Sequence, residues 1–142
     1  MVDLEPVIPV MAELHRDGTG WIVFEPGFDP DDAPPPSGLF GLFSSKGPAV
    51  PDVSWVPGTP TEVGIRHGSG PKAVPRLAEV GHPVPDRWVL RQDHSRRGLV
   101  LAVPPDEEHE RTVRWLLEAA TLLTSFPIGD DWRAAVYRPP QS

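Results

Sequence analysis

Residues 99–125 read LVLAVPPDEEHERTVRWLLEAATLLTS, and this stretch decides the fold. The first five residues are a short apolar run, which predicts a buried strand, and two prolines follow them. Residues 106–125 then predict a helix, because apolar side chains recur at the spacing of one helical face. These side chains are Val113, Leu116, Leu117, Ala120 and Leu123. Asp106 is placed to cap the helix, and the glutamates after it favour the positive end of the helix dipole.

Further elements flank this stretch on both sides. Apolar runs at 61–67 and 88–91 predict two more strands, with a short helix at 71–80 between them. Residues 132–137 predict a final strand. The order from residue 61 is therefore β-α-β-β-α-β, which is the order of a ferredoxin-like domain. We predict an α+β fold with a mostly antiparallel sheet and two helices.

The N-terminal part is harder to assign. Residues 7–25 predict a β-hairpin, because two apolar runs flank an Asp-Gly step. Residues 26–52 predict a long acidic loop rich in Pro and Gly, and 53–56 a short edge strand. The length of 142 residues suits one domain that spans 1–142.

Composition and charge restrict the function classes. The chain has no Cys, which excludes disulfides and thiolate chemistry. Its formal charge is -7, and an acidic chain is a poor general nucleic-acid binder, although it suits a basic protein partner. Without a leader-like N-terminus or a long apolar run, we expect a cytoplasmic protein that does not span a membrane. The absence of Asn, with two lysines among 13 basic residues, favours a bacterial gene of high GC content.

The polar motifs do not assemble into a catalytic or metal-binding set. Asp93, His94 and Ser95 are consecutive, whereas a catalytic triad converges in space, so we interpret them as a hairpin tip. His109 has no carboxylate or His three or four residues further on, so we predict no metal site there. We expect no cofactor and no catalytic residue, and we lean towards a protein that is not an enzyme.

An apolar cluster inside the acidic loop is the basis of the functional prediction. Its apolar side chains are Leu39, Phe40, Leu42 and Phe43. At about 25 cal/mol per Å² of apolar area, their removal from water would contribute several kcal/mol of stabilisation. They fold back on the domain, dock on a second copy of the chain, or bind a protein partner. We predict a non-enzymatic interaction or accessory protein, resembling small acidic immunity or adaptor proteins in its charge, with these four residues as the partner site.

The alternative is a small-molecule-binding domain or a small enzyme with the 26–52 loop as a lid. Its polar groups for a ligand or an anion would be His67, Lys72, His94 and Arg97, with Tyr137 nearby. The turn at 67–72 also has a simpler interpretation, in which its glycines only relieve backbone strain. Among the five Trp residues, we expect Trp115 to face outward or to cover a sheet edge, and the others to pack mainly in the core.

Overall fold

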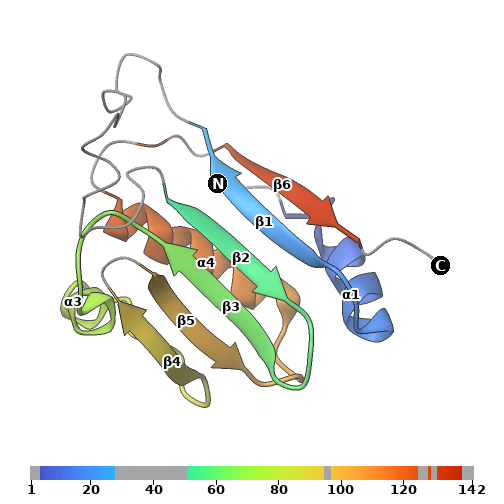
Figure 1. The fold of residues 1–142 in the computed structure, drawn as a ribbon, viewed down its shortest axis with the longest axis horizontal. Coiled ribbons are helices and arrows are strands. Elements are labelled where there is room, and N and C mark those ends of the chain that lie inside the picture. The colour runs from blue at the N-terminus through green and yellow to red at the C-terminus, as the bar shows by residue number, and fades with distance from the viewer. Residues whose placement is uncertain (1–3, 28–50, 95–96, 125–127, 129–130, 139–142) are drawn as a thin grey trace.

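The computed structural model describes residues 4–27, 51–94, 97–124, 128 and 131–138. Within these ranges it contains one six-stranded sheet and three helices, so the predicted α+β class is confirmed, with one helix more than expected (Figure 1). The helices are α1 (Ile8–Asp17), α3 (Ala73–Glu79) and α4 (His109–Leu123). The strands are β1 (Trp21–Pro26), β2 (Asp52–Val56), β3 (Thr61–Arg66), β4 (Val89–His94), β5 (Gly98–Val103) and β6 (Trp132–Tyr137). None of these helices is long and apolar enough to cross a membrane.

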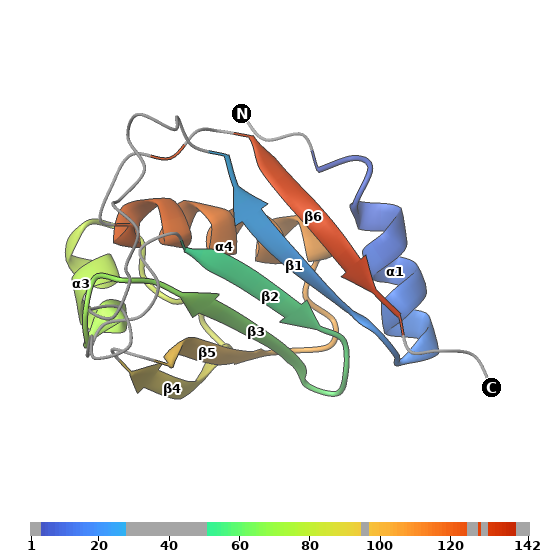
Figure 2. The same ribbon diagram turned by 45° about the horizontal axis from the view of Figure 1, so that its top comes forward.

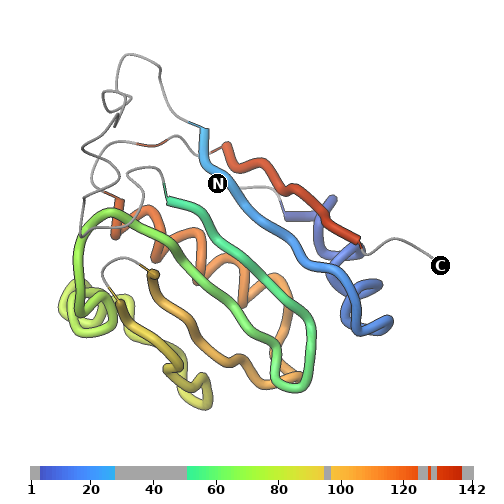
Figure 3. The backbone as a smooth tube through the Cα atoms, in the orientation of Figure 1, coloured from blue at the N-terminus to red at the C-terminus, as the bar shows by residue number. Residues whose placement is uncertain are grey.

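The sheet has the strand order β4-β5-β3-β2-β1-β6, and all neighbouring strands are antiparallel. The predicted element order from β3 to β6 is correct, but the ferredoxin-like arrangement is not confirmed. In that arrangement the last strand would lie beside β3. Here β2 forms a hairpin with β3 and β1 pairs with β2, so that β6 pairs with β1 instead (Figure 3). For the same reason the strand predicted at 53–56 lies inside the sheet and is not an edge strand.

The predicted N-terminal hairpin is wrong, because its first half is the helix α1. Val7, Met11 and Leu14 are buried on one side of this helix at a spacing of four and then three residues, which is a helical period. Pro9 is in the first turn, where a proline is tolerated. Gly18 ends the helix with a φ of 68°, and its N–H bonds to the carbonyl of Leu14 at 2.8 Å. The Asp-Gly step is therefore a helix C-cap, and not a hairpin turn.

The helices α1 and α4 lie on one face of the sheet, and α3 packs against α4 at the end of the sheet (Figures 1 and 2). α4 crosses behind the central strands, with α1 behind β1 and β6 and α3 beyond the end of β3 (Figures 1 and 2). Inward side chains alternate along the strands, and the largest of them that are fully buried are Phe24, Trp55, Ile65 and Leu101. They meet the apolar face of α4, on which Leu116 is fully buried. The core therefore lies between one helix layer and one sheet face.

Two local predictions around α4 are wrong. Of the two alternatives for Trp115, the outward orientation is wrong: this residue is 8% exposed, stacks on His82 at 4.8 Å between ring centroids and donates to the carbonyl of Pro83 at 2.9 Å. It also contacts Trp88, which precedes the edge strand β4, at 5.2 Å. Asp106 does not cap α4, because Arg87 donates to its carboxylate at 2.9 Å and the helix begins at His109. Both corrections arise from contacts with residues 82–88, which the sequence of the helix alone does not reveal.

Candidate functional site

The predicted partner site at Leu39, Phe40, Leu42 and Phe43 lies outside the described residues. Most of the predicted 26–52 loop lies outside them as well, with only its two ends described. The alternative candidates His67, Lys72, His94 and Arg97 are all described. They come from the loop after β3, the start of α3 and the β4–β5 hairpin.

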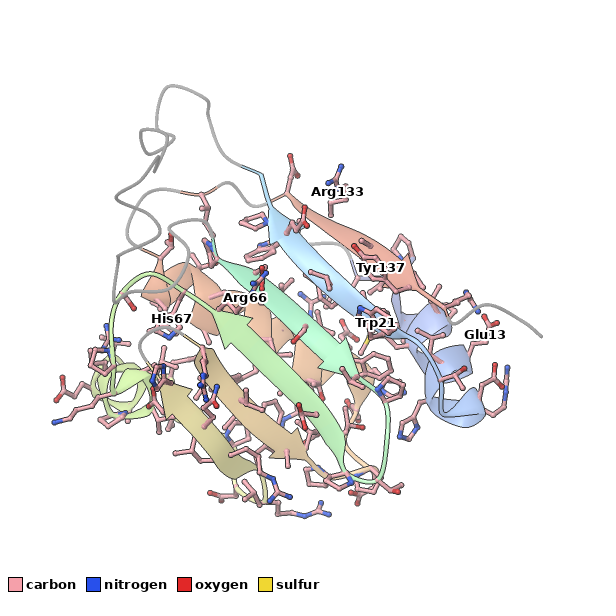
Figure 4. All side chains as sticks on the ribbon, in the orientation of Figure 1. Glu13, Trp21, Arg66, His67, Arg133 and Tyr137 are labelled. Atoms are coloured by element: carbon pink, nitrogen blue, oxygen red, sulfur yellow. The ribbon has the colours of Figure 1, made fainter. Side chains whose placement is uncertain are left out.

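His67 is buried at the end of β3 (Figure 4), and its hydrogen bonds define its protonation. The backbone N–H of Ser69 donates to Nδ1 at 3.4 Å, and the Ser69 hydroxyl lies 3.0 Å from the same nitrogen. In the tautomer in which Nδ1 accepts from this backbone N–H, the proton of the neutral ring is on Nε2. Among the described residues, Nε2 has no hydrogen-bond partner although it is buried. In that tautomer, His67 presents a buried N–H donor that none of the described residues pairs with.

The charges around His67 favour this neutral ring. Burial lowers its pKa, and the positive charge of Arg76 lowers it further, while the carboxylate of Asp93 acts in the opposite direction. Arg76 donates to the carbonyl of Gly70 at 2.9 Å, so the cation is held at the glycine-rich turn. A neutral His67 is a hydrogen-bond donor suited to a carbonyl or carboxylate oxygen.

The N-terminal end of α3 already binds a carboxylate, that of Asp93. Both carboxylate oxygens of Asp93 accept from α3, one from the N–H of Ala73 and one from the N–H of Val74, each at 3.0 Å. These two donors, which follow the predicted turn at 67–72, are therefore engaged by Asp93 of β4. Lys72 is exposed beside them with a φ of 61°.

His94 and Arg97 lie at the tip of the β4–β5 hairpin. The N–H of Arg97 donates to Nδ1 of His94 at 3.2 Å, and both side chains are exposed. Asp93 and His94 end β4, and the Ser95 of the sequence motif lies outside the described residues. Asp93 joins the base of this hairpin to α3, and His67 is near enough to Asp93 to feel its charge.

A second group of histidines joins α1 to α4 and was not anticipated from the sequence. His15 and His109 meet edge to face at 5.4 Å between ring centroids, and His109 contacts Trp55 of β2 at 5.6 Å. Burial lowers the pKa of His109, and the neighbouring His15 lowers it further. Within the described ranges, no three side chains of His, Asp or Glu gather as metal ligands.

The sheet face opposite the helices, called the open face below, carries a stacked and exposed aromatic pair. Trp21 of β1 and Tyr137 of β6 are cross-strand partners, and their rings stack at 5.2 Å and 9° (Figure 4). Trp21 is 43% exposed and Tyr137 44%. Val56 and Val89 lie on the same face and are also exposed.

The rest of the open face is flat and then charged. A row of small or short side chains crosses its middle in register: Ala135, Val23, Ser54, Gly64 and Val100. At the far end Arg66 pairs with Asp52, with one bond of 3.0 Å, and Arg133 pairs with Glu25 at 3.1 Å. Along the strands, the open face therefore changes from exposed aromatic rings, through a row of small side chains, to two ion pairs. Side chains alternate between the two faces of a strand, and Ile22 and Phe24 are buried. This alternation is the sequence signal that could have placed Trp21 on the open face.

Comparison with family models, with curated proteins and with solved structures found no match.

Proposed function

We propose that this chain is a non-enzymatic interaction protein that binds a basic protein partner through its open face. The observation that supports this is the stacked pair Trp21 and Tyr137 on a sheet face where none of the three described helices lies. Trp and Tyr are enriched among residues that dominate binding energy, because they bury a large area at a small cost in side-chain entropy.

The shape of the open face supports a protein partner. Gly64 is in the flat middle row, and a Cβ there would come within 2.9 Å of the Ser54 hydroxyl oxygen. The small side chains of this row allow another surface to approach the sheet closely. The two ion pairs at one end supply a polar rim, which is the usual surround of an apolar contact.

The charge of the chain supports a basic partner. The formal charge is -7, so a positively charged protein is attracted over a distance of about 10 Å at moderate salt. The exposed rings of Trp21 and Tyr137 are suitable platforms for arginine side chains, because a guanidinium stacks favourably on an aromatic face.

The test is capture of partners from extracts of the source cells with a matched pair of variants. The double variant Trp21→Ala/Tyr137→Ala removes the stacked rings, and Leu122→Ala removes an equally exposed apolar side chain on α4. We expect basic proteins to bind the unaltered chain and the Leu122 variant, and to be recovered about tenfold less with the double variant, a loss of about 1.4 kcal/mol. Circular dichroism checks that each variant is folded. The proposal would be contradicted by equal recovery with all three chains. It would also be contradicted if no captured protein depended on Trp21 and Tyr137 for its binding.

A second candidate function is binding of a small ligand with an acceptor oxygen at His67, as the sequence alternative suggested. The observation that favours it is the buried Nε2, for which the described part of the chain supplies no hydrogen-bond partner. If it is correct, carboxylate and phosphate compounds should raise the thermal midpoint of the unaltered chain but not that of His67→Phe. Equal shifts in the two chains, or none in either, would speak against this function.

A further inference from the structure

We infer that two copies of this chain associate edge to edge through β6, with a two-fold axis at Ala135, to form one continuous sheet. The β6 edge borders the open face and shares Tyr137 with it, but the inference rests on the pairing of β6 and not on the proposed function. It starts from a difference between the two edge strands of the sheet, β4 and β6.

The β4 edge carries features that prevent pairing, whereas β6 does not. The register of β4 shifts between Leu90 and Gln92, and such a bulge interrupts the edge that another strand would need. β6 keeps an unbroken register over all six of its residues and contains neither Pro nor Lys. Its middle residues Ala134 and Ala135 are small enough to let another backbone approach. Of the two edges, β6 is therefore the one to which the described residues leave room for a further strand.

A two-fold axis perpendicular to the sheet makes two β6 strands antiparallel and keeps the helices of both copies on one side. Opposed residues must then lie on the same face, so residue numbers in each pair add to an even sum. With the axis at Ala135, this residue faces itself, and Arg133 faces Tyr137 of the second copy. Arg133 is 81% exposed and can lie against that ring, and no like charges are opposed.

The same register explains an apolar residue left exposed on the helix side. Val136 pairs with the buried Ile22, yet it is itself 40% exposed. A hollow of about 340 Å³ lies next to Ala134, and its lining is mainly apolar, with Leu4 and Trp132 among the residues. With the axis at Ala135, Val136 of the second copy is directly opposite Ala134 and reaches the rim of this hollow. The contact occurs twice, so both exposed valines gain apolar neighbours.

Charge substitution at the axis tests the inference. The mass from light scattering should be twice the 15.5 kDa of one chain. Ala135→Lys and Ala135→Glu should each weaken association at least about tenfold, because like charges then face each other across the axis. An equimolar mixture of the two should restore the dimer. The control Val89→Lys adds the same charge on the open face at β4, away from the axis, and should leave the mass of the dimer unchanged. A monomeric unaltered chain, or an Ala135→Lys variant that dimerises normally, would overturn the inference.

Cross-linking gives a second readout that does not depend on charge. The chain has no Cys, so Ala135→Cys introduces a single thiol by a small change. Opposed residues of an antiparallel pair have Cβ atoms about 5 Å apart, within reach of a short bismaleimide. We expect covalent dimers with Ala135→Cys and few with Val89→Cys at the same concentration. Equal yields from both thiols would mean random collision, and the inference would then fail.

Discussion

Replacement of Asp93 by Ala should destabilise the protein by about 2 to 4 kcal/mol, because this carboxylate holds the start of α3. It accepts from the N–H groups of Ala73 and Val74 at 3.0 Å each. Loss of a helix cap costs about 1 kcal/mol, and leaving a buried donor unpaired costs about 1 to 3 kcal/mol. Ala73 is fully buried, so its N–H cannot turn to water. Asp93→Asn keeps one acceptor and should lose about half as much.

Urea unfolding measures this effect. With a slope near 2 kcal/mol per M, a loss of about 3 kcal/mol lowers the midpoint by about 1.5 M. The control Asp86→Ala alters an exposed turn and should stay within about 0.5 kcal/mol of the unaltered chain. Removal of the Asp93 charge should also lower the pKa of His67 further, which an NMR titration of the ring would show. An Asp93→Ala midpoint equal to that of the Asp86 control would refute the capping role.

Further predictions concern the buried His67, the half-buried His109 and two glycines. His67 and His109 have pKa values lowered by burial, so the unfolded chain binds more protons, and stability should fall as the pH drops below about 6.5. His15→Gln removes one cause of the lowered pKa of His109 and should reduce that loss, whereas an unchanged pH profile would contradict the His15–His109 coupling. Gly98 has a φ of 90°, and a Cβ there would overlap the backbone of β3, so Gly98→Ala should cost about 2 to 4 kcal/mol in urea unfolding. Gly70 has a φ of 96° with open space around it, so Gly70→Ala should cost about 1 kcal/mol, and equal losses would show that the contact with β3 is unimportant.

Local patterns were sufficient to predict the elements from residue 61 onward. The apolar face of α4 has the helical period, and β3 and β5 are short segments bounded by turn residues, so their type and approximate bounds follow from the residues themselves. The first helix was missed because its prolines and the Asp-Gly step have two interpretations. Only the burial of Met11 and Leu14 against the sheet decides between them.

Strand order and the candidate sites depend on contacts between distant segments, which explains why they were not predicted. Nothing in β6 indicates that it pairs with β1, and the open face exists only because of that order. The stack of Trp21 on Tyr137 and the contact of His15 with His109 arise in the same way. The burial of His67 also depends on packing around the end of β3. A glycine-rich turn in the sequence indicates a bend but not what surrounds it.

The pairing of β1 with β6 also has a consequence for how the chain folds. Glu25 and Arg133, which meet across these strands, are 108 residues apart in the sequence. During synthesis, β1 can join the β2–β3 hairpin early, but its other side stays bare until residues 132–137 have left the ribosome. Such distant pairings are slow to form because a long loop must close first. A nascent chain should therefore be most prone to misassembly just before β6 arrives, and removal of β6 should expose β1 as an aggregation-prone edge.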